Sequence, residues 1–140
     1  MLFEASITIP KNTLETSPTT IIFGIAKGII TKLIVAPRPG HHAVAHCIIL
    51  HHEHQIAPST DGMDFSGDEH DIPWEEYYES YQPPYELKIK GWNSSTKYPH
   101  TFDVFVAILP RKAIIATALV DAIKSLFEIV SPRRIFTGKG

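Results

Sequence analysis

The chain contains a single cysteine, Cys47, among its 140 residues. One cysteine cannot form a disulfide within one copy, and it excludes a zinc site built from several thiolates. Long apolar runs are also scarce. The main one, residues 113–130, carries Asp121 and Lys124 near its middle, where charge is costly in a bilayer core. We therefore expect no membrane span. The N-terminus lacks the features of a signal peptide, so we expect synthesis in a cytoplasm.

Basic residues are missing from the middle of the chain. No lysine or arginine lies between Pro39 and Leu87, a stretch with ten carboxylates, whereas six basic and two acidic residues follow from Arg111 onward. The acidic middle disfavours nucleic acid as a partner. Both regions are compatible with ordinary solvated surface. They are equally compatible with docking of the basic end of one copy on the acidic region of the next, which closes into a ring or shell.

Short alternating segments bounded by turn residues recur through residues 1–110, which we expect to form one β domain. They are residues 3–9, 19–25, 28–36, 42–51, 72–81, 85–92 and 100–109. The segments 19–25 and 28–36 are separated by a Lys-Gly turn, and both faces of 42–51 are apolar, as in a central strand. Seven or eight such strands predict a mainly β fold, an antiparallel β-sandwich or jelly roll.

The period changes to that of a helix over residues 111–130. Polar side chains there form one narrow stripe at Thr117, Asp121, Lys124, Ser125 and Glu128, and the rest of the circumference is apolar. Such a helix needs more cover than one sheet face gives. We therefore expect an interface between copies, with a basic extended tail over 131–140. The expected interface residues are Ile114, Ile115, Leu119, Ile123, Leu126, Phe127, Arg133 and Arg134.

Catalytic signatures are missing. The chain has no Gly-x-Ser-x-Gly elbow, P-loop or dinucleotide fingerprint. Cys47 and His46 are adjacent in an alternating segment, so their side chains should point to opposite faces. We expect no enzymatic activity and no cofactor.

Histidines suggest an alternative, because seven of the eight lie between His41 and His70. If residues 46–54 stay extended, His46, His52 and His54 project to one face and could share a metal, as in cupin-like jelly rolls. The spacing departs from the cupin pattern. Hydrogen-bonded histidines at a strand end, or at a pH-sensitive interface, are the other interpretation. The polar loop 61–69 offers oxygen ligands for calcium but lacks the EF-hand spacing.

Aromatic residues suggest a second alternative. Trp74, Tyr77 and Tyr78 lie close together among carboxylates. Aromatic side chains on a β surface can stack on sugar rings, which indicates a carbohydrate- or ligand-binding module. Packing of the same side chains in the core is the competing interpretation.

Residues Pro84–Trp92 alternate cleanly and read as an inner arm of a β-hairpin. With a β-sandwich, an apolar helix and a basic tail around it, the chain resembles the jelly-roll decoration and accessory proteins of tailed phages. This resemblance implies a non-enzymatic structural subunit of the virion, made in the host cytoplasm. It also implies a homo-oligomer, such as a trimer or ring, that docks on other virion structural proteins.

Removal of residues 111–140 should leave a folded β domain that no longer assembles, because the apolar helix would be gone. Light scattering on the full and truncated chains checks this prediction. A truncated chain that kept the parent's oligomeric mass would contradict it.

Overall fold

The computed structural model describes residues 1–129. It divides into a first compact unit, Met1–Ile108, and a second unit that begins at Leu109, close to the expected boundary at 110. The predicted tail with Arg133 and Arg134, and the last residue of the predicted helix, lie outside the described residues. The elements are β1 (Leu2–Ile9), β2 (Thr19–Gly24), β3 (Gly28–Pro37), β4 (Ala45–His51), β5 (His54–Ala57), β6 (Ile72–Ser80), β7 (Glu86–Asn93), β8 (His100–Leu109) and α1 (Arg111–Ile129).

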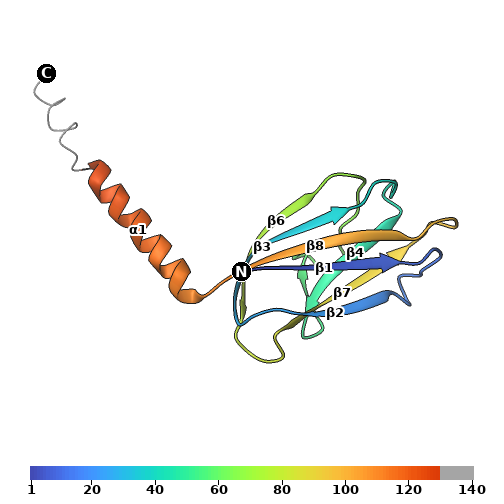
Figure 1. Cartoon of the computed structure of the whole chain (residues 1–140), viewed down its shortest axis with the longest axis horizontal. Coiled ribbons are helices and arrows are strands. Elements are labelled where there is room, and N and C mark those ends of the chain that lie inside the picture. Colours follow the sequence, from blue (N-terminus) through green and yellow to red (C-terminus); the bar gives the residue numbers. More distant parts are fainter. Residues whose placement is uncertain (130–140) are drawn as a thin grey trace, which may run out of the picture. The chain divides into compact units, whose positions relative to one another are not determined.

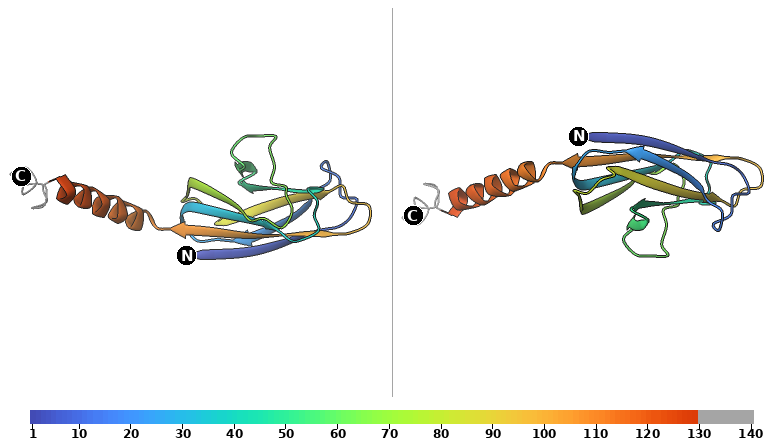
Figure 2. Two further views of the ribbon diagram at one scale, coloured as in Figure 1. Left: turned by 90° about the horizontal axis from the view of Figure 1, so that it is seen from above. Right: turned by 90° about the horizontal axis from the view of Figure 1, so that it is seen from below.

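The eight strands form two four-stranded sheets, in the orders β1-β8-β3-β6 and β2-β7-β4-β5 (Figure 1). β1 pairs with β8, β2 with β7, β3 with β6 and β4 with β5, all antiparallel. The pairs are therefore nested around the β4–β5 turn, as if one long hairpin had been wrapped into two layers. Figure 2 shows the two layers from above and below. This arrangement is the jelly roll, and it confirms the predicted fold class.

Alternating apolar residues build the core between the sheets. In β8, every second residue from His100 to Ile108 is buried, as the period of two in a strand requires. Ile7 and Phe102 from one sheet and Leu87 and Ile89 from the other are fully buried. Each such side chain stabilises the fold by about 1.5–3 kcal/mol. Every residue of this core cluster, and of the side chains packed against it, lies within 3–108.

One strand boundary and one turn differ from the sequence prediction. β4 begins at Ala45 rather than at residue 42, because His42 and Ala43 have φ angles of 48° and 58° and belong to a turn. The chain then reverses at His52 and Glu53, with φ angles of 51° and 62°, so residues 46–54 are not the single extended segment that the metal-site alternative required. Two positive φ values define a tight hairpin turn of the kind that Asn-Gly usually forms. This pair carries no such sequence signal, so β5 was missed.

The predicted hairpins are wrong. β2 and β3, expected to be joined by a turn, belong to different sheets. The segment Pro84–Trp92 contains β7, which lies between β2 and β4, whereas its chain neighbours β6 and β8 belong to the other sheet. Alternation shows that a strand exists and which face is apolar, but it does not identify the partner strand. Another expectation is confirmed, because β4 is a central strand, and β6 lies at the edge of the other sheet.

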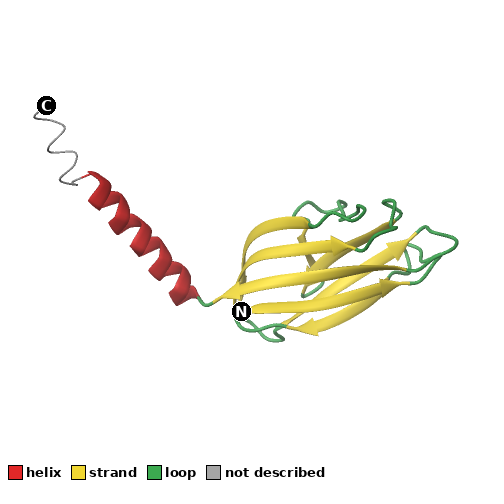
Figure 3. Ribbon diagram, turned by 45° about the horizontal axis from the view of Figure 1, so that its top comes forward, coloured by secondary structure: helices red, strands yellow, loops and turns green. Residues whose placement is uncertain are grey.

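Loops gather at both ends of the strands (Figure 3). At one end, the fully buried side chain of Asn93 holds several loops together. Its Nδ2 donates to the carbonyl oxygens of Ile9 and Tyr98 at 3.3 and 3.0 Å. Its Oδ1 accepts from the backbone N–H of Ser95 at 2.9 Å. These bonds fix the end of β1 against the segment that leads into β8.

Gly91→Ala should destabilise the protein by about 1–3 kcal/mol, the usual range for overpacking a core. A Cβ at residue 91 would lie 2.4 Å from Cδ1 of Ile9 in the facing sheet. Gly24→Ala is the matched control, because nothing lies within 4 Å of its added Cβ. Chemical denaturation of both variants measures the difference, and equal stabilities would contradict the close packing.

Candidate functional site

Two hydroxyl groups in the polar stripe of helix α1 bond to backbone carbonyls of the same helix. The Pro110 carbonyl accepts from the N–H of Ala113 at 3.0 Å in the first turn. Within the polar stripe, the hydroxyl of Thr117 donates to the Ala113 carbonyl at 2.9 Å, and that of Ser125 to the Asp121 carbonyl at 3.1 Å. These two hydroxyls therefore need no partner outside the helix.

The large apolar side chains of α1 are between 43% and 68% exposed. At about 100° of rotation per residue they cover an arc of about 140°. We name this surface the α1 face: Ile115, Leu119, Val120, Ile123, Leu126 and Phe127.

Five of the predicted helix residues fall on the α1 face, and the sixth does not. Ile114 is partly buried and sits in the sector of the polar stripe, about 100° from Ile115. Val120 was missed, although its position in the helical period could have identified it. No helix within residues 1–129 is long and apolar enough to cross a membrane.

The structure separates the three histidines predicted to share a metal. The chain reverses after His51, so His52 lies in the turn and His54 on the returning strand β5. His46 instead bonds Asp64 through Nδ1 at 2.7 Å and stacks on Trp92, with ring centroids 5.7 Å apart. The prediction that all three project to one face is wrong. Residues 1–129 contain no group of three or more His, Cys, Asp or Glu side chains arranged to hold a metal, the 61–69 loop included.

Three histidines, His41, His51 and His100, are buried, and the first two have polar contacts inside the sandwich. The Nε2 atom of His41 lies 2.8 Å from the Thr101 carbonyl, and its ring contacts His100 and Phe102 at centroid distances of 4.7 Å. Nδ1 of His51 lies 2.8 Å from the Tyr78 hydroxyl. Burial lowers the pKa of both side chains, because the charged ring loses its hydration. Both therefore stay neutral near pH 7.

The aromatic residues of β6 do not form one surface. Trp74 and Tyr78 face the core side of the sheet and pack against the core cluster. Tyr77 projects from the opposite face and is 58% exposed. The alternation of a strand imposes this split, so the predicted trio cannot contact one ligand together.

Trp74 lines a pocket beneath the loop that connects β5 to β6. Figure 2 shows this loop, coloured green, standing out from the sandwich. The pocket has a volume of about 310 Å³. We name it the 58–71 pocket after the loop that forms most of its wall. It is lined by Pro58, Thr60, Met63, Asp64, Phe65, Ser66, Ile72 and Trp74.

Hydrogen bonds hold the walls of the 58–71 pocket. The side-chain amide of Gln55 donates to the carbonyls of Pro58 and Met63 at 2.8 and 3.0 Å. The rings of Phe65 and Trp74 meet edge to face, with centroids 5.6 Å apart. Sequence reasoning missed Met63 and Phe65. The sequence feature that could have indicated this pocket is the presence of these two large apolar residues inside an acidic, glycine-containing loop.

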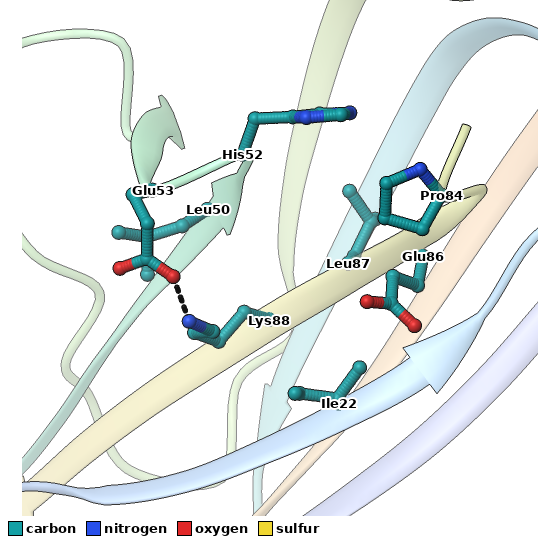
Figure 4. Close-up of a pocket in the computed structure, with 8 residues that line it drawn as sticks. All are labelled: Ile22, Leu50, His52, Glu53, Pro84, Glu86, Leu87 and Lys88. Carbon is teal, nitrogen blue, oxygen red and sulfur yellow. Dashed lines mark hydrogen bonds and ion pairs between the residues drawn. The ribbon is translucent and has the colours of Figure 1, made fainter. Parts of the chain in front are cut away.

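A smaller pocket of about 170 Å³ lies between the β4–β5 turn and β7 (Figure 4). Glu53 points from the turn to Lys88 and pairs with it, while His52 points away from that pair. Lys90 Nζ lies 3.9 Å from the second oxygen of Glu53. The ion pairs of Glu53 with Lys88 and Lys90 attach the turn to β7.

The single thiol is part of the core. Cys47 is fully buried, and its backbone exchanges two hydrogen bonds with Phe65 at 2.9 and 3.0 Å. Burial raises its pKa far above the ordinary range, so the thiolate that would react is not formed at neutral pH. This contact also anchors the loop that carries the 58–71 pocket.

Comparison of the chain with protein families, with curated proteins and with solved structures found no match.

Acidification should reduce the free energy of unfolding. His41 and His51 have folded-state pKa values below the ordinary 6.5, so the unfolded chain binds more protons. Their contribution is fully present above about pH 6.5 and is lost as the pH falls below that value and through the lowered folded-state pKa values. Urea denaturation between pH 7.5 and 5 measures the loss.

Matched variants identify the residues responsible for this pH dependence. His41→Gln and His51→Gln should each flatten it, because glutamine does not titrate in this range. His54→Gln changes an exposed histidine and should leave the slope as in the parent. An unchanged slope in both buried-site variants would show that other groups cause it.

Proposed function

We propose that the protein is a non-enzymatic structural subunit of a virus particle, which self-assembles through helix α1. The carrying observation is the α1 face, with six large apolar side chains between 43% and 68% exposed. Apolar surface of this kind, gathered on one side of an element, marks an interaction site. The partner we propose for the α1 face is the same face of a second copy, since each face would then shield the other from water.

The first unit supports this proposal because its core is complete. The two sheets bury each other's inner faces, and all core residues belong to 3–108. A subunit that forms its own core can add an apolar helix for joining copies without losing its fold. A closed jelly roll with a joining element is the plan expected for a particle subunit from the resemblance to phage decoration proteins.

Energetics favour association through the α1 face. Burial of roughly 300 Å² of apolar surface on each helix would contribute about 7 kcal/mol per copy. Association also costs translational and rotational freedom, and burial of two such faces, or of a ring of them, offsets that cost. The polar stripe on the opposite side stays in water, and this fixes which side of the helix meets its partner.

A carbohydrate- or ligand-binding module is the second candidate, favoured by Trp74 in the 58–71 pocket. The separation of Tyr77 from Trp74 and Tyr78 weakens it, because sugar-binding surfaces commonly use several aromatic rings together. The α1 face has no role in such a module. Assembly accounts for it, and is therefore the proposal we prefer.

Leu119→Glu combined with Ile123→Glu should convert the oligomer to a monomer of 15.7 kDa, because two buried carboxylates without partners are strongly unfavourable. Native mass spectrometry and sedimentation velocity measure the change. Thr117→Glu with Ser125→Glu is the matched control, since it adds the same charge to the polar stripe. The control should keep the parent mass. A monomeric parent, or an oligomeric L119E/I123E chain, would refute assembly through α1.

Particles purified from producing cells should contain the chain in a fixed ratio to the main shell or tail protein. The L119E/I123E chain should be depleted from them, while T117E/S125E should be present as in the parent. Quantitative mass spectrometry of gradient-purified particles gives these ratios. Absence of the parent chain from every particle fraction would overturn the virion role. Self-assembly through α1 would then still be tested by the native mass spectrometry of the purified chains.

A further inference from the structure

The 58–71 pocket has the form of a docking site for one apolar side chain. Its volume of about 310 Å³ is at the lower end of the range for ligand pockets. Phe65 at the base is 4% exposed, while Met63 at the rim is 58% exposed. A flexible, polarizable methionine in the lining adapts well to an inserted side chain. The pocket therefore offers the buried anchor position that protein interfaces use.

Acidic residues belong to this pocket or lie next to its lining residues in the chain. Asp64 is one of its lining residues, Asp61 lies in the loop between two lining residues, and Asp71 directly precedes Ile72. Glu76 is close by, because its Oε2 accepts from the Trp74 indole N–H and from the Ser59 hydroxyl, both at 3.2 Å.

No lysine or arginine belongs to the lining or to residues 58–71. Asp61 and Asp71 are exposed, so their charges are available to a partner. The matching ligand is a segment with one large apolar side chain and basic neighbours.

The C-terminal segment of the chain has this composition. Residues 130–140 contain three basic residues, no acidic residue, and the pair Ile135-Phe136 directly after Arg133 and Arg134. We propose that the 58–71 pocket of one copy binds the C-terminal segment of a second copy. Phe136 fills the pocket and the two arginines face the acidic residues of the pocket and its loop. Aromatic and arginine side chains are the residues that most often dominate interface energies.

This inference rests on the proposed function, because α1 holds the copies together and so raises the local concentration of C-terminal segments. The contact is head-to-tail: a pocket on one copy meets a segment of the next. Contacts of this kind close into rings or extend a lattice. It therefore adds a second step, in which oligomers made through α1 join into larger assemblies.

Charge reversal in the full chain tests the contact. Arg133→Glu with Arg134→Glu, and separately Asp61→Lys with Asp71→Lys, should each stop assembly at the α1 oligomer and weaken the larger species at least tenfold. A mixture of the two variant chains should regain the larger species, because reversed charges again meet opposite ones. Sedimentation velocity at low ionic strength measures these distributions. The matched control, Glu4→Lys with Glu15→Lys, makes the same charge change at exposed sites outside the pocket and should behave as the parent.

Cysteine pairing identifies the occupant. A Met63→Cys chain mixed with a Phe136→Cys chain, under mild oxidation, should give a disulfide-linked dimer on a non-reducing gel. Cys47 is fully buried and provides no competing thiol in the folded protein. Met63→Cys mixed with a Glu15→Cys chain is the control and should give little linked product.

The outcomes separate this inference from the proposed function. If the charge reversals leave the mass distribution unchanged while L119E/I123E dissolves the oligomer, the pocket contact is refuted and assembly through α1 stands. If L119E/I123E leaves the parent mass unchanged, the proposed function fails first. If a single chain carrying both Met63→Cys and Phe136→Cys forms its disulfide within one copy, and the mixture of the two singly substituted chains gives no linked dimer, the segment binds its own pocket and the second copy is refuted. Sugar binding lost in Trp74→Ala, with no effect of the charge reversals, would assign the pocket to a ligand instead.

Discussion

The mutual burial of the two inner sheet faces is the interaction on which the rest of this structure depends. Ile7 and Phe102 on one sheet pack against Leu87 and Ile89 on the other, and all four are fully buried. Because the strands pair in a nested order around the β4–β5 turn, neither sheet can form its apolar face without the other. The close approach of Gly91 to Ile9 shows how little space is left between them.

A complete core has a consequence for the second unit. The apolar side chains of α1 are as hydrophobic as those of the sandwich, yet none belongs to the core cluster. The hydroxyls of Thr117 and Ser125 are satisfied within the helix, whereas the large side chains of the α1 face remain exposed. This is the physical basis for proposing that the helix joins copies, and for treating the sandwich as the body that is joined.

The loop between β5 and β6 connects this body to the charge pattern of the chain. It is fixed by the backbone bridge between Cys47 and Phe65 and by the Gln55 amide, so its acidic residues belong to a segment that lines a formed pocket. The segregation of acidic and basic residues along the chain is then explained by the proposed contact between copies. The acidic side is a built surface with an apolar centre, and the basic end carries an aromatic residue of suitable size.

The sequence by itself determined where most strands and the helix lie, which faces are apolar, and how charge is divided along the chain. These follow from local periodicity, which every element carries within its own residues. The tertiary structure alone decided which strands pair, that His46 meets Asp64 and Trp92 while His52 and His54 lie elsewhere, and that Met63, Phe65 and Trp74 line one pocket. Such contacts join residues far apart in the chain. These long-range contacts form because two apolar faces are buried against each other, and the local pattern of a single segment does not show which segments will meet.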